Sequence, residues 1–147
     1  MAIKLITKTI TVNASREKVW EQITNTNKAA MWASEFMPDT RVEGSFELGK
    51  IIYFKDDSGN GLGGTVIINQ PVEHLKINYN IAIEQGVEHT EGVEYEKWIG
   101  CYDDFYLTED HGNTILALES VAPEEYYNDF VPGWDKSLNK IKEMAEN

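Results

Sequence analysis

The sequence predicts an α+β fold in which a long C-terminal helix lies across a curved, seven-stranded antiparallel sheet. Between Leu75 and Ile83, apolar residues alternate with polar ones, which is typical of a strand with one buried face. Residues 40–121 consist of strand-like segments separated by short turns, as in an antiparallel meander. From Val131 to Ala145, apolar residues recur at steps of three and four, which predicts an amphipathic helix. A sheet covered by helices on one face is an α+β arrangement.

Two short helices are predicted between the first strand and the rest of the sheet. Residues 4–12 are rich in Ile, Thr and Val, which favour a strand. Ser15 is a typical helix N-cap residue, and an apolar helical face follows it. The second helix covers residues 27–33 and ends before Pro38, because the residue preceding a proline disfavours helical geometry.

Six strand-like segments follow these helices. They cover residues 41–46, 50–55, 65–70, 75–83, 95–108 and 114–121. Trp98 and Phe105 have opposite parity along one of these strands, so both can face the interior only across a bulge, which we place at Gly100–Cys101. Pro132 fits the first turn of the final helix, where its missing N–H has no cost.

Length, charge and cysteine content narrow the class of protein. The chain of 147 residues fits one domain, residues 1–147, whose core needs no disulfides. A net charge of −12, with Arg16 and Arg41 as the only arginines, argues against nucleic-acid binding, and an acidic surface repels anionic membranes. With a single cysteine, Cys101, no signal peptide and no long apolar stretch, we expect a soluble, cytoplasmic protein.

Two turn-rich motifs resemble ligand loops. Gly59, Gly61 and Gly64 have the spacing of a nucleotide-binding loop, but the residues after them predict a strand where that loop needs a helix. Residues 56–61 imitate the first half of a calcium loop, yet Ile67 occupies the position of the closing glutamate. We therefore expect a β-hairpin. The three histidines lack ligand spacing, so we predict no metal site and no cofactor.

Candidate pocket residues are large apolar or aromatic side chains that the predicted fold aims between helix and sheet, together with one carboxylate. They are Trp32, Phe36, Tyr53, Tyr79, Trp98, Asp103, Phe105, Leu118, Trp134 and Leu138. Each aromatic ring has core packing as the alternative to ligand contact. Asp103 shares the parity of Phe105, so it faces inward, where burial raises the pKa of a carboxyl and suits it to orient a ligand or act as a general acid. The alternative places Asp103 in water at the end of the strand.

A family resemblance rests on short segments spread in order along nearly the whole chain. They are Val19–Trp20, Met31–Trp32, Arg41–Phe46, Gly64–Pro71, Asn113–Thr114, and Gly133–Trp134 with Leu138. Together they resemble the family related to the C-terminal domain of the heat-shock protein 90 ATPase activator, in the START-like superfamily of Bet v allergens and polyketide cyclases. The resemblance implies a helix-grip fold with a cavity beneath the last helix. It also implies binding of hydrophobic small molecules, but it carries over no catalytic residues.

Three functions remain open at this point. The leading hypothesis is the binding of a small hydrophobic or aromatic ligand in the groove, by a monomer or homodimer. The first alternative is an enzyme of cyclase or hydrolase type that uses Asp103 or a pocket tyrosine as acid or base. The second alternative is a protein-interaction or co-chaperone-like module that engages a partner through its acidic loops.

Overall fold

The computed structural model describes residues 2–147, whose strands form one antiparallel sheet with helices packed on one face. The strands are β1 (Ile3–Val12), β2 (Arg41–Gly44), β3 (Ile51–Lys55), β4 (Gly61–Gln70), β5 (His74–Glu84), β6 (Val87–His89), β7 (Tyr102–Asp110) and β8 (Asn113–Pro123). The helices are α1 (Arg16–Thr24), α2 (Thr26–Ala33), α3 (Val93–Glu96) and α4 (Tyr127–Glu146).

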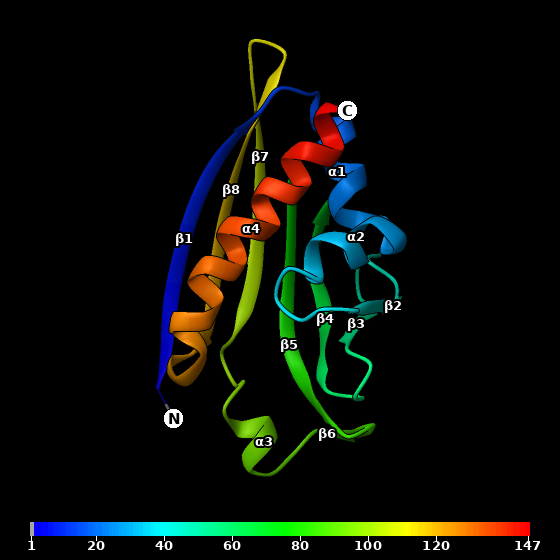
Figure 1. The fold of residues 1–147 in the computed structure, drawn as a ribbon, viewed down its shortest axis with the longest axis vertical. Coiled ribbons are helices and arrows are strands. Elements are labelled where there is room, and N and C mark those ends of the chain that lie inside the picture. Colours follow the sequence, from blue (N-terminus) through cyan, green and yellow to red (C-terminus); the bar gives the residue numbers. More distant parts are fainter. Residues whose placement is uncertain (1) are drawn as a thin grey trace.

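The sheet order is β1-β8-β7-β5-β4-β3-β2, with β6 paired to β5. Figure 1 shows α4 running diagonally across this sheet, with α1 and α2 beside its C-terminal half. The predicted α+β, helix-grip architecture is confirmed. The described residues contain eight strands, one more than predicted, because β6 adds a short hairpin partner at the end of β5.

Helix α4 is held by one buried face. Trp134, Leu138, Ile141 and Ala145 are at most 3% exposed, and they meet the apolar face formed by β1, β7 and β8. Full burial of a large apolar side chain contributes about 1.5–3 kcal/mol, so this stripe fixes the helix against the sheet. The helix begins at Tyr127, which puts Pro132 inside it and not in its first turn as predicted. Pro132 therefore cannot donate a helical hydrogen bond to the carbonyl of Asn128.

The segment before β7 departs from the predicted strand over residues 95–108. Residues Val93–Glu96 form the short helix α3, and β7 begins only at Tyr102. Between them, the N–H of Trp98 donates to the Tyr95 carbonyl at 3.0 Å. Gly100, at φ +85°, redirects the chain into β7 through a backbone conformation that glycine adopts without strain. Trp98 reaches the interior from this turn, so the expected bulge at Gly100–Cys101 is absent.

The alternation along β5 is interrupted at Asn80. Tyr79 pairs with Gly64 and Ile81 with Gly63, which leaves Asn80 as the extra residue of a bulge. A Cβ added at Gly64 would meet the side chains of Ile77 and Tyr79, whereas one added at Gly63 would meet those of Tyr53 and Ile81. Because Gly63 and Gly64 face opposite sides of the sheet, Ile81 lies on the other face from Tyr79.

Candidate functional site

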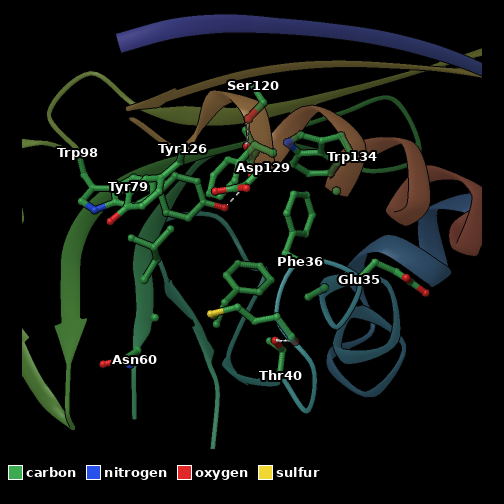
Figure 2. A pocket seen from close by; sticks show the side chains of 18 of the residues that line it. Glu35, Phe36, Thr40, Asn60, Tyr79, Trp98, Ser120, Tyr126, Asp129 and Trp134 are labelled. Carbon is green, nitrogen blue, oxygen red and sulfur yellow. Dashed lines mark hydrogen bonds between the residues drawn. The ribbon is translucent and has the colours of Figure 1, made fainter. Parts of the chain in front are cut away.

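A cavity of about 780 Å³ lies between the sheet, the N-terminal half of α4 and the segment that follows α2. Figure 2 shows aromatic side chains around it, with Tyr79 and Trp98 on one side and Phe36 and Trp134 on the other. Its wall includes Trp32, Phe36, Phe54, Leu62, Tyr79, Ala82, Trp98, Asp103, Ser120, Tyr126, Phe130 and Trp134. The volume is within the range of roughly 300–1,000 Å³ that is usual for small-molecule sites.

Two groups of rings form the apolar walls. In the first, Trp134 packs edge-to-face on Phe36 at a centroid distance of 4.8 Å and stacks on Trp32 at 6.1 Å. The second group, which we name the aromatic cage, consists of Trp98, Tyr126 and Phe130. Its rings stack with centroids 5.7 Å apart for Trp98 and Tyr126, and 5.8 Å apart for Tyr126 and Phe130.

Asp103 is the buried carboxylate of the cavity wall, and two hydroxyls hold it in place. The Tyr79 hydroxyl donates to Asp103 Oδ2 at 2.5 Å, and the Ser120 hydroxyl donates to Oδ1 at 2.6 Å. Dashed lines beside Tyr79 and Ser120 in Figure 2 mark these bonds. Burial raises the pKa of Asp103 to about 6, although both hydrogen bonds act in the opposite direction. Burial, and then the charge of Asp103, raise the pKa of Tyr79 well above its usual value.

The indole N–H of Trp134 has no hydrogen-bond partner within residues 2–147, although the side chain lines the cavity and the residue is only 2% exposed. In Figure 2, the nitrogen edge of the Trp134 ring is turned toward the side where Tyr79 and Ser120 lie. A buried donor without a partner costs about 1–3 kcal/mol, so such groups call for an acceptor from water or a ligand.

The structure brings six of the ten sequence-predicted pocket residues to the cavity. They are Trp32, Phe36, Tyr79, Trp98, Asp103 and Trp134. Phe105, Leu118 and Leu138 are buried in the adjoining core, where Phe105 packs edge-on against the ring of Trp134. Tyr53 lies with Ile81 on the opposite face of the sheet, with the Lys55 ammonium 5.0 Å from its ring centroid. That any of these residues contacts a ligand remains a prediction.

Several residues that line the cavity are absent from the set predicted from the sequence. Ser120 continues the inward parity of Leu116 and Leu118 along β8, and this alternation was the available signal. Tyr126 and Phe130 precede Trp134 at successive steps of four, which would have extended the apolar stripe of α4 backward. The stripe predicted from the sequence begins at Val131, so it leaves out Tyr126 and Phe130, whereas Trp98 of the aromatic cage is among the predicted residues.

The glycine-rich turn is a hairpin, as predicted. Asp56 Oδ1 accepts hydrogen bonds from the backbone N–H groups of Ser58 and Asn60, both at 2.9 Å. Gly61 opens β4 and Gly64 lies inside it, where a nucleotide-binding loop would need a helix. Over residues 2–147, no group of three or more His, Cys, Asp or Glu side chains is arranged to hold a metal ion. None of the helices in that span combines the length and the apolar character needed to cross a membrane.

A curved antiparallel sheet that grips a long C-terminal helix over an apolar cavity defines the START-like class of helix-grip proteins. A sequence model of the family described as activator of Hsp90 ATPase homolog 1-like protein matches residues 13–146, and the chain belongs to that family. No curated protein sequence matches the chain.

Solved structures share the fold at low sequence identity. The Aha1 dimer from Colwellia psychrerythraea superposes with a TM-score of 0.73 at 18% identity, over 97% of this chain and 96% of that one. CalU16 from Micromonospora echinospora superposes with a TM-score of 0.66 at 17% identity, over 99% of this chain and 77% of that one. DynU16, a protein of the dynemicin biosynthetic locus, superposes with a TM-score of 0.71 at 16% identity. The match covers 97% of this chain but only 47% of DynU16. At these identities the likeness shows the fold alone.

Proposed function

We propose that the protein binds a small, largely apolar ligand with aromatic character in the cavity beneath α4. The observation that carries this proposal is the ring-lined cavity of about 780 Å³, whose wall includes Trp134 with its buried, unpartnered indole N–H. An acceptor atom on a bound ligand removes the penalty.

The remaining polar groups give the site an orientation. Asp103 is fixed by Tyr79 and Ser120, so its free lone pairs point in a defined direction. The Trp134 donor is turned toward the side where Tyr79 and Ser120 hold Asp103, so the two groups together favour a ligand whose polar atoms lie at one end. A few fixed polar groups in an apolar wall are the usual composition of a small-molecule site.

A blocking substitution tests the proposal. Ala82 is 5% exposed and lines the cavity beside Trp98, so Ala82→Leu fills part of the ligand volume. Ala117 lies on the opposite parity of β8 from Leu116 and Leu118, so Ala117→Leu adds the same bulk to the other face of the sheet. The neutral dye N-phenyl-1-naphthylamine should bind the wild type and Ala117→Leu saturably, at one site, and bind Ala82→Leu at least about tenfold more weakly.

Native mass spectrometry of the freshly purified protein complements the titration. A co-purified small molecule that the dye displaces would support the proposal. Absence of saturable dye binding to the wild type, or equal affinity in all three proteins, would contradict it.

A second candidate function is acid–base catalysis on the bound ligand. It is favoured by one observation, the buried Asp103 that belongs to the cavity wall and whose pKa burial raises to about 6. A carboxyl with such a pKa can give or take a proton near neutral pH. Conversion of a co-purified ligand by the wild type, lost in Asp103→Asn while the ligand still binds, would establish this function. A ligand that stays chemically unchanged in the wild type would exclude it.

Two further proposals concern location and assembly. The single cysteine, which cannot form an intramolecular disulfide, supports a cytoplasmic, reducing environment. The Colwellia relative was solved as a dimer, which supports a homodimer for this chain. Light scattering coupled to size-exclusion chromatography should then give twice the 16.7 kDa mass of the chain, and a single-chain mass would leave the monomer.

A further inference from the structure

We infer that the cavity selects ligands carrying a protonated amine, with the cation held between the aromatic cage and the Asp103 carboxylate. This inference rests on the proposed function and adds the chemical class of the ligand. It stands on three features of the cavity: a buried carboxylate without a cationic partner, the aromatic cage beside it, and the sign of the charges in the lining.

The first feature is Asp103 itself. Its two oxygens accept hydrogen bonds only from neutral hydroxyls, and no Lys, Arg or His within residues 2–147 forms an ion pair with it. Buried carboxylates are normally paired with a cation, because an isolated charge is costly in an apolar interior. Each oxygen still has lone-pair capacity for a donor from the cavity. A ligand ammonium supplies both the missing charge and that donor.

The second feature is the aromatic cage. Tyr79 joins it to the carboxylate, since its hydroxyl binds Asp103 while its ring meets Trp98 edge-on at a centroid distance of 6.3 Å. The faces of Trp, Tyr and Phe rings attract cations, most strongly where water is excluded. One cation already lies at the edge of the cage, since the Lys97 ammonium is 5.6 Å from the ring centroid of Tyr126.

The third feature is the charge of the lining. Its carboxylates are Glu35, Glu84, Glu94, Asp103 and Asp129, and its single ammonium is that of Lys136. Lys97 offsets Glu94 through an ion pair of 3.0 Å, but no described cation forms an ion pair with Glu35, Glu84 or Asp129. Carboxylates around a cavity with low-dielectric walls concentrate cations and repel anions. Fatty acids and other anionic amphiphiles are therefore disfavoured.

Three probes of one shape and different charge test the inference. They are naphthalen-2-ylmethylamine, which is protonated at neutral pH, naphthalen-2-ylmethanol, and naphthalene-2-carboxylate. Isothermal titration calorimetry at pH 7.5 and low salt should show the amine binding at least about tenfold more tightly than the alcohol, since a hydrogen bond between charged groups is added. The carboxylate should bind most weakly of the three.

Two aspartate variants test whether Asp103 causes the preference for the amine. Asp103→Asn should reduce the preference for the amine over the alcohol by at least about tenfold, with little change in the affinity for the alcohol. Asp110→Asn is the matched control, because it removes the same charge from an exposed hairpin position outside the cavity, and it should keep the preference. If Asp103→Asn fails to fold, the comparison of the three probes on the wild type still decides the inference.

The outcomes separate the two proposals. If the alcohol binds as tightly as the amine, or the carboxylate binds best, the cavity is a ligand site but the charge inference is wrong. If none of the three probes binds and N-phenyl-1-naphthylamine does not bind either, the proposed function fails and the inference fails with it.

Discussion

Trp32 and Trp134 stack against each other with ring centroids 6.1 Å apart and an angle of 27° between their planes, but only one of them has a partner for its N–H. Trp32 Nε1 donates to the carbonyl of Gln22 at 3.2 Å, whereas Trp134 Nε1 has no acceptor among residues 2–147. Both residues are 2% exposed. The two tryptophans are therefore equally buried, but only Trp32 donates a hydrogen bond.

This contrast predicts unequal costs for the same substitution. Trp32→Phe removes a donor and leaves the Gln22 carbonyl unpaired, while Trp134→Phe removes a donor that already lacks a partner. We expect the free energy of unfolding to fall by about 1–3 kcal/mol more for Trp32→Phe than for Trp134→Phe. Urea denaturation of both variants, freed of any bound ligand, measures the difference. Equal losses would mean that Trp134 has an acceptor in solution.

Gly133 gives a second stability prediction, because the ring of Phe36 lies against its α-carbon. A Cβ added at Gly133 would come within 2.6 Å of Phe36 Cδ1. Alanine normally stabilises a helix interior relative to glycine by about 0.5–1 kcal/mol, but overpacking costs about 1–3 kcal/mol. We expect Gly133→Ala to destabilise the protein by about 1 kcal/mol.

A double-mutant cycle isolates the cause of this loss. With Phe36→Ala in place, the obstructing ring is gone, so Gly133→Ala should stabilise the fold by about 0.5–1 kcal/mol. Denaturation of the four proteins in the cycle supplies the two differences. A destabilisation by Gly133→Ala that is unchanged in the Phe36→Ala background would show that the close approach to Phe36 is not responsible.

The inward-facing positions of β7 and β8 follow from the alternation of residues along each strand, which is why the sequence alone predicts that Asp103 faces the interior. Its parity with Phe105 decides its face, and nothing interrupts β7 between them. Tyr53 shows the opposite situation. Its face depends on which residue of β5 is bulged, and Ile81 and Ile83 continue the apolar alternation past Asn80 without any local sign of the change. The bulge arises from pairing with Gly63 and Gly64, a contact that no single segment encodes.

Trp98 illustrates a different limit. The residues before it form a helix of a single turn, too short for periodicity to distinguish from a strand. Gly100 was the available signal, because an isolated glycine within an apparent strand often marks a turn or a bulge. The bulge is predicted from the sequence, whereas Gly100 adopts a positive φ and forms the turn.

Cys101 should be almost inert in the folded protein. It is completely buried, and burial together with the nearby charge of Asp103 raises the pKa of its thiol to about 12. Because the thiolate is the reactive form, iodoacetamide at pH 8 should modify the native protein at least about a hundredfold more slowly than the chain unfolded in urea. Mass spectrometry of timed samples measures both rates. Similar rates would show that the segment around Cys101 opens to solvent.

The final prediction concerns pH and follows from the burial of Asp103. In the folded protein its pKa is raised from an ordinary value of 3.8 to about 6, so the folded state binds the proton more tightly than the unfolded state. The stabilisation from this group is fully present below about pH 4 and is lost as the pH rises through about 6. The charge of Asp104 raises the pKa of Asp103 further, whereas the hydrogen bond from Tyr79 lowers it. Cys101 is a third titratable group nearby. Burial also raises the pKa of Tyr79 and Cys101, so both stay neutral in this window.

Asp103→Asn removes this titration and serves as the reference. We expect the free energy of unfolding of the wild type, minus that of Asp103→Asn, to decrease by up to about 3 kcal/mol between pH 4 and pH 7, since each unit of pKa shift corresponds to about 1.4 kcal/mol. Urea denaturation of the ligand-free proteins at several pH values gives this difference, and subtraction cancels the titration of the carboxyls that do not interact with Asp103. For the exposed Asp110→Asn, the corresponding difference should lack this decrease. A difference for Asp103→Asn that stays constant or rises with pH would mean that Asp103 is solvated in the folded state, and the buried carboxylate would then be lost as an anchor for a ligand.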